Sequence, residues 1–80
     1  NDQRWGAEVE IQIKDYGAER AKFCMLDEDT NYASVACGLG CKGFKVSSIK
    51  ELKKIIKAAF SLKATTIIDV NIEGLPGPTL

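Results

Sequence analysis

The chain has 80 residues, enough for one domain, and 45% of them are apolar and 28% charged, as in an ordinary globular protein. It holds no apolar run of the roughly 18 residues that a membrane span needs, so we expect no membrane association. Eleven basic residues balance eleven acidic ones. Without a basic excess to bind phosphate backbones, we also expect no nucleic-acid partner.

The early stretch GAEVEIQIKDYGAERAKF, residues 6–23, has a mixed pattern. Val9, Ile11 and Ile13 alternate with polar residues, which is typical of a half-buried strand. Glu, Gln, Lys and Ala are nevertheless good helix formers, and the span before Gly17 is short enough to be one irregular helix. The residues alone leave both interpretations open.

Residues 31–40, NYASVACGLG, predict a short helix. Asn31 is a favourable N-cap, and Gly40 follows the helix where a left-handed residue commonly ends it. The apolar stripe that we expect to face the core consists of Tyr32, Val35, Ala36 and Leu39.

A second helix is predicted to begin at Ser48, after a short strand at Gly43–Val46. Its apolar residues recur every three or four positions through SSIKELKKIIKAAFSLK. Ser48 and Glu51 form a capping-box pattern, in which each side chain bonds a backbone N–H of the first turn. The opposite face carries lysines that we expect to be solvated: Lys50, Lys53, Lys54 and Lys57.

Residues 64–72, ATTIIDVNI, are β-branched and nearly continuously apolar, which predicts a strand covered on both faces. Two strands joined by a helix predict a parallel sheet, hence an α/β fold with the order helix, strand, helix, strand. Two short strands and two helices cannot cover such a sheet, so we expect residues 1–80 to be part of a larger domain. Its other strands would lie upstream, on another chain or on a piece lost to cleavage. Residues 73–80, EGLPGPTL, should form a surface tail.

Cys24, Cys37 and Cys41 are an odd number of cysteines without Cys-x-x-Cys spacing, and the chain has no histidine. Neither a disulfide framework nor a zinc site is expected. Because unpaired thiols are typical of a reducing compartment, we expect a cytoplasmic protein.

Taken together, NDQRWGAE, NYASVACGLGCKGFKVSSIKELKKIIKAAF and TTIIDVNI resemble the C-terminal, diphosphate-binding domain of thiamine diphosphate-dependent enzymes. The likeness is to the acetolactate synthase-like group, and QRWGAE is most similar to sulfoacetaldehyde acetyltransferase. The resemblance favours a helix over the early stretch. It also implies the cofactors thiamine diphosphate and Mg²⁺.

In such enzymes a Gly-Asp-Gly triplet, an Asn-Asn pair and a backbone carbonyl two residues beyond the pair hold the metal and diphosphate. The resemblance therefore implies that the triplet lies upstream of residue 1. Placed by Trp5-Gly6, the pair falls on Asn1 and Asp2, with the carbonyl on Arg4; Asp stands where Asn is usual. In the alternative register Asn1 is the ligand and Gln3 gives the carbonyl. The implied metal ligands are Asp2, Asn1 and Arg4, within a cofactor-binding run comprising Asn1, Asp2, Gln3, Arg4, Trp5 and Gly6.

The resemblance implies a lyase or transferase that acts on a small 2-oxo acid or sulfoaldehyde and passes a two-carbon unit to an acceptor. No catalytic residue is expected in this chain, which should be inactive alone. Its partner would be the rest of the enzyme or a second chain, in a dimer or tetramer.

Two alternatives stay open at this point. The chain could be a small non-catalytic α/β binding module, or one chain of a split enzyme. Asn and Asp are also frequent in plain turns, so NDQR need not bind a metal. Glu8 could face substrate, although a solvent-exposed helical Glu is the more common case.

Overall fold

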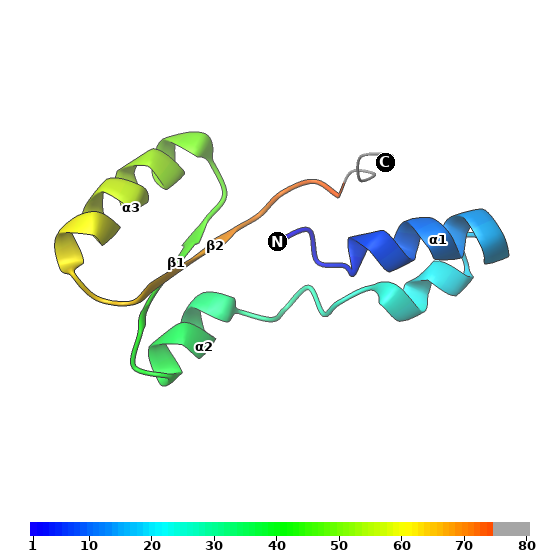
Figure 1. Ribbon diagram of the computed structural model, residues 1–80, viewed down its shortest axis with the longest axis horizontal. Helices are drawn as coiled ribbons and strands as arrows, with labels where there is room; N and C mark the ends of the chain where they lie inside the picture. Colours follow the sequence, from blue (N-terminus) through cyan, green and yellow to red (C-terminus); the bar gives the residue numbers. More distant parts are fainter. Residues whose placement is uncertain (75–80) are drawn as a thin grey trace. The chain divides into compact units, whose positions relative to one another are not determined.

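The structure is a computed structural model that describes residues 1–74 (Figure 1). They divide into two compact units: the first contains residues 1–29 with Glu73 and Gly74, and the second contains residues 30–72. No helix in this part of the chain is both long and apolar enough to cross a bilayer. Residues 75–80, most of the expected tail, lie outside the described residues.

In the first unit, residues Gly6–Tyr16 form helix α1, so the preference for a helix over the early stretch is confirmed. Val9 is completely buried, whereas Ile11 and Ile13 are 49% and 43% exposed. A strand would put all three on one face, but a helical period turns only one of them fully inward. Gly17 ends the helix with a φ of 89°, a conformation that glycine adopts without strain.

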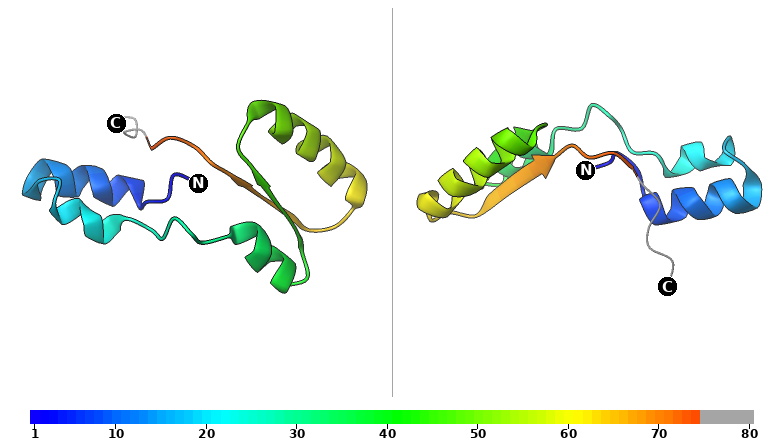
Figure 2. Two further views of the ribbon diagram at one scale, coloured as in Figure 1. Left: turned by 180° about the vertical axis from the view of Figure 1, so that it is seen from behind. Right: turned by 90° about the horizontal axis from the view of Figure 1, so that it is seen from above.

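A short 3-10 helix, η1, follows at Arg20–Cys24 and was not predicted from the sequence. It runs back along α1 in both views of Figure 2 and buries Ala21. Its five residues show no apolar period of their own. Its formation therefore depends on packing against α1 rather than on a local sequence signal.

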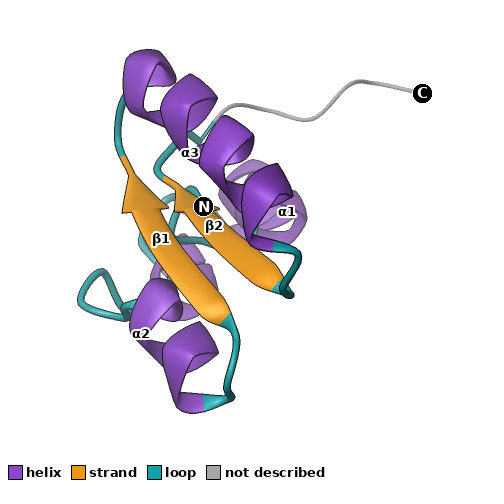
Figure 3. Ribbon diagram, turned by 90° about the vertical axis from the view of Figure 1, so that its left-hand side faces the viewer, coloured by secondary structure: helices purple, strands orange, loops and turns teal. Residues whose placement is uncertain are grey.

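In the second unit, β1 (Lys42–Val46) and β2 (Thr66–Val70) form a two-stranded parallel sheet, with Phe44 opposite Ile68. Helix α3 (Ile49–Leu62) connects the strands and covers one face, and α2 (Tyr32–Gly38) covers the other (Figure 3). The predicted α/β class and the order helix, strand, helix, strand are confirmed.

Helix α2 is capped as predicted, because the Asn31 Oδ1 accepts a hydrogen bond from the Ser34 N–H at 3.1 Å. The predicted apolar stripe is wrong, since Leu39 is 75% exposed and Val35 53%. The buried residues are instead Ala33 and Ala36. The reason is the close approach of the α2 backbone to Gly43 of β1, which leaves room only for small side chains.

Helix α3 begins where the sequence predicts. The Ser48 Oγ accepts from the Glu51 N–H at 3.2 Å, which confirms the N-cap. The reciprocal bond is displaced by one residue, because the Glu51 carboxylate accepts from the N–H of Ser47 at 3.4 Å. The four lysines are exposed, as expected.

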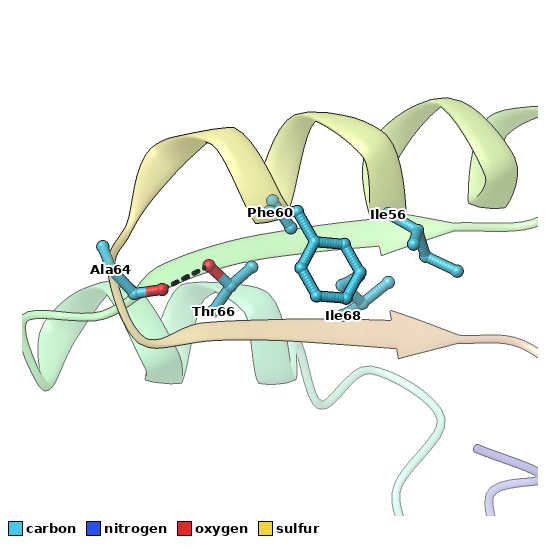
Figure 4. A pocket seen from close by; sticks show the side chains of 6 residues that line it. Ile56, Phe60, Ala64, Thr66 and Ile68 are labelled. Atoms are coloured by element: carbon cyan, nitrogen blue, oxygen red, sulfur yellow. Dashed lines mark hydrogen bonds between the residues drawn. The ribbon is translucent and has the colours of Figure 1, made fainter.

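Strand β2 is shorter than the predicted 64–72, and its burial differs from the prediction. Asp69 is its most buried residue, at 5% exposure, whereas Ile67 is 41% exposed. Between α3 and β2 lies an open apolar groove of about 450 Å³, where the Phe60 ring lies near Ile68 (Figure 4). One neighbouring strand and two helices therefore leave much of β2 uncovered.

Candidate metal and diphosphate loop

Residues 1–5 pair with the chain that leaves η1. Arg4 and Met25 form an antiparallel bridge, flanked by two hydrogen bonds. The Trp5 N–H donates to the Cys24 carbonyl at 2.8 Å, and the Leu26 N–H donates to the Gln3 carbonyl at 2.9 Å. These bonds tie residues 1–5, the loop that precedes α1, to the segment that follows η1.

Asn1 and Gln3 make a tight turn at the start of this loop. The Asn1 Oδ1 accepts from the Gln3 N–H at 3.0 Å, and Gln3 has a φ of 59°, in the left-handed region. The plain-turn interpretation of NDQR is thus correct for the backbone of these residues. The side-chain oxygen of Asn1 and the carbonyl of Gln3 are both engaged in hydrogen bonds.

Asp2, unlike Asn1 and Gln3, is held by an ion pair. Its Oδ2 is 3.7 Å from the Arg4 Nε, and each of the two side chains keeps about a quarter of its surface exposed (24% and 25%). The same oxygen lies 3.4 Å from the point that a β-carbon on Gly6 would occupy, so the carboxylate stands over the first residue of α1. A negative charge at this position interacts favourably with the positive end of the helix dipole.

Arg4 makes a second contact. Its Nη2 donates to the Gly74 carbonyl at 2.8 Å, and a β-carbon on Gly74 would overlap the guanidinium group. The backbone carbonyl of Arg4 accepts no hydrogen bond from the described residues. It is therefore a backbone oxygen of the loop that remains available to a ligand.

Trp5 and Gly6 complete the predicted run. The Trp5 carbonyl accepts from the N–H groups of Glu8 and Val9, both at 3.0 Å, and so starts α1. Trp5 itself is 64% exposed. Glu8 lies half-buried in the first turn of α1, with its side chain in no hydrogen bond among the described residues.

The loop fits part of a magnesium site. Asp2, Asn1 and the Arg4 carbonyl offer only oxygens, the donors that this hard cation prefers, and Mg²⁺ is usually held by one or two carboxylates plus phosphates and water. Among the described residues no group of three His, Cys, Asp or Glu could hold a metal. An ion bound here would need further ligands beyond this loop.

The three cysteines are free, with Cys37 exposed and the other two half-buried. The structure therefore agrees with the expectation that they form no disulfide. Between Cys37 and Cys41, helix α2 ends at Gly38, and Gly40 follows it with a φ of 85°, as predicted for the residue after the helix.

Sequence reasoning missed the role of the Arg4 side chain. Its partner Gly74 is 70 residues away, and the Arg4 guanidinium contacts it through a backbone carbonyl. Every residue type has a backbone carbonyl, so the sequence does not indicate which residue accepts such a bond. Only the absence of a side chain at Gly74 is a signal, and glycine is common in turns for other reasons.

Residues 1–70 match the family described as thiamine pyrophosphate enzyme, C-terminal TPP binding domain. No curated protein and no solved structure shows a significant match to the chain. The family match covers the candidate loop and every helix and strand of residues 1–74. The chain belongs to the family of C-terminal domains with which thiamine pyrophosphate enzymes bind their cofactor.

Proposed function

We propose that residues 1–6 are the metal and diphosphate loop of a Mg²⁺-dependent thiamine diphosphate enzyme. In this proposal the Asp2 side chain and the Arg4 carbonyl are ligands to the ion, and Asn1 lies beside them. The observation that carries it is the Asp2 carboxylate, which is three-quarters buried over the first residue of α1. This loop lies within the part of the chain that matches the cofactor-binding family.

The hydrogen bonds support the Asp2 register over the alternative. In the alternative register the ligands would be the Asn1 side chain and the Gln3 carbonyl, and both already accept a backbone N–H. The Asp2 carboxylate has only an ion pair at 3.7 Å, and the Arg4 carbonyl has no donor among the described residues. Binding a cation through Asp2 and Arg4 would break no backbone bond of the loop.

The cofactor, when bound, supplies the carbanion chemistry of these enzymes, and the protein supplies binding and orientation. In this chain Asp2 and the Arg4 carbonyl would hold the Mg²⁺ ion, which would offset the negative charge of the diphosphate. Trp5, through its backbone bonds to Cys24, Glu8 and Val9, fixes the loop against α1. The Asp2 carboxylate lies over Gly6, at the first turn of the helix.

The proposal is tested by measuring thiamine diphosphate affinity in the complete enzyme at fixed Mg²⁺ by calorimetry. Asp2→Ala should weaken binding by about 10-fold or more, because removing one ligand or its support typically costs 10- to 100-fold in metal affinity. Asp15→Ala, at the exposed end of α1, is the matched control and should leave the affinity unchanged.

Asn1→Ala separates the registers in the same assay. A larger loss of thiamine diphosphate affinity in Asn1→Ala than in Asp2→Ala would favour the alternative register. Unchanged affinity in both variants would refute the metal role of the loop.

For the reaction, we propose a lyase or transferase of the acetolactate synthase-like or sulfoacetaldehyde acetyltransferase-like kind, with a small 2-oxo acid or sulfoaldehyde as substrate. The support is the run QRWGAE at residues 3–8. Sulfoacetaldehyde and phosphate would give acetyl phosphate and sulfite, whereas a 2-oxo acid would release carbon dioxide. Sulfite release that requires phosphate would identify the first reaction, and its absence would exclude that reaction.

We also propose that the chain works within a larger assembly, with the rest of the enzyme or a second chain as partner, in a dimer or tetramer in the cytoplasm. The support is the amount of apolar surface left exposed on the described residues, including Phe60 at 84%, Ile49 at 73% and Ile67 at 41%. The three free cysteines suit a reducing compartment.

A further inference from the structure

We propose that the Arg4 side chain is a positioning residue that holds and neutralises Asp2, and thereby lowers affinity for the bare metal ion while raising affinity for the metal-bound diphosphate. This inference rests on the proposed function of the loop. It concerns the side chain of Arg4, whereas the proposed metal ligand is the backbone carbonyl of the same residue.

The first step is the charge at the loop. Asp2 is the acidic side chain in residues 1–6, and the Arg4 Nε lies 3.7 Å from its Oδ2. Each side chain is only about a quarter exposed, at 24% and 25%, so water screens the pair less than it would screen a fully exposed one. Without Arg4, the loop would present a net negative charge to an anionic diphosphate.

The second step is how Arg4 is held. Its Nη2 donates to the Gly74 carbonyl at 2.8 Å, while its backbone pairs with the strand-like segment at Met25. A guanidinium is a planar group with several donors, so one end can bond Gly74 while the other faces Asp2. Gly74 has no β-carbon to displace it. The cation is thus fixed beside the carboxylate rather than free to turn into solvent.

The third step is the consequence for two different ligands. A bare divalent cation must compete with the Arg4 guanidinium for the Asp2 carboxylate, so Arg4 weakens its binding. The metal-bound diphosphate carries negative charge, and Arg4 offsets the charge of Asp2 that would repel it. The two affinities should therefore respond in opposite directions when the charge of Arg4 is removed.

The test uses the complete enzyme and two titrations. Mn²⁺ alone is titrated by electron paramagnetic resonance in the absence of cofactor, and thiamine diphosphate is titrated by calorimetry at saturating Mg²⁺. In Arg4→Gln we expect Mn²⁺ to bind about 3- to 5-fold more tightly, and thiamine diphosphate about 3- to 5-fold more weakly, as for a partly exposed ion pair.

Arg4→Lys is the matched control, since lysine keeps the charge but loses the planar fork that reaches Gly74. Both affinities should shift in the same directions as in Arg4→Gln but by a smaller factor, because lysine keeps the charge but not its fixed position beside Asp2. A role limited to tethering Gly74 would instead weaken both ligands, and equally in Arg4→Lys and Arg4→Gln. That result, or unchanged affinities in Arg4→Gln, would overturn the inference. Thermal melts of both variants check that the fold is kept.

A failure of the proposed function gives other titration results than a failure of the inference about Arg4. If Asp2→Ala leaves both titrations unchanged, or if the wild type binds no Mn²⁺ with or without cofactor, the loop is not the metal site and both proposals fall. If Asp2→Ala weakens both ligands but Arg4→Gln shows no opposite shift, only the inference about Arg4 falls.

Discussion

Gly43 shows how a single residue sets the packing of the second unit. A β-carbon there would overlap the backbone of Ala33, so the absence of a side chain lets α2 lie directly against β1. The buried residues of α2 are accordingly the small Ala33 and Ala36. The sequence shows the glycine, but not the helix that approaches it, which is why the stripe of larger residues was predicted wrongly.

Replacing Gly43 by alanine should destabilise the protein by about 1–3 kcal/mol, because overpacking forces the backbones apart. Gly38→Ala is the matched control, since no atom lies within 4 Å of the added carbon and alanine favours a helix. We expect that control to be neutral or slightly stabilising. Urea unfolding of both variants measures the difference, and equal stabilities would contradict the close contact at Gly43.

Predictions for single residues were correct where the interaction joins residues close in the sequence. Asn31 and Ser48 each accept an N–H three residues ahead, and both caps were predicted from the sequence alone. Arg4 is the opposite case, because its ion pair with Asp2 is local but its bond to Gly74 spans the chain. No pattern of neighbours could have predicted the second contact.

At the level of elements, helix α3 is the one that the sequence defines best. It has a long apolar period, a lysine face and a capped start, and the observed bounds are Ile49–Leu62. Helix α1 has alternating apolar residues that suit a strand equally well, and the resemblance to a family was needed to favour a helix. Strand β2 was predicted correctly in type, but its ends depend on a partner strand only five residues long.

Removing the cap of α3 should cost about 1 kcal/mol, the usual value for an N-cap serine replaced by alanine. In Ser48→Ala the Glu51 N–H loses its acceptor. Ser47→Ala is the control, because the Ser47 hydroxyl takes part in no hydrogen bond among the described residues and only its backbone N–H is used. Chemical denaturation should show a lower free energy of unfolding for Ser48→Ala alone. An equal decrease in both variants would show that the Ser48 cap does not specifically stabilise α3.

At the level of the whole molecule, the described residues bury few large side chains. Only Val9 and Val46 are completely enclosed among the larger ones, while Phe60, Leu39 and Ile49 remain mostly exposed. Apolar surface of this extent is typical of interfaces. It supports the proposal that the chain acts within a larger enzyme, where the remaining ligands of the metal site would be found.

The sequence predicted the α/β class and the order of elements in the second unit, and the family match confirms the thiamine diphosphate-binding family. The metal site remains a proposal, because residues 1–6 supply only part of a ligand set. The further ligands that this proposal needs lie beyond residues 1–6, and the spacing within those six residues does not identify them.

The most direct test of the central claim locates the metal itself. In the complete enzyme, Fe²⁺ replaces Mg²⁺, and ascorbate with hydrogen peroxide generates radicals that cut the backbone nearest the ion. With thiamine diphosphate present, we expect the cuts within this chain to fall at residues 1–6, and to disappear in Asp2→Ala but not in Asp15→Ala. Cuts elsewhere in the chain, or cuts at residues 1–6 that persist in Asp2→Ala, would contradict the assignment of Asp2 as a ligand.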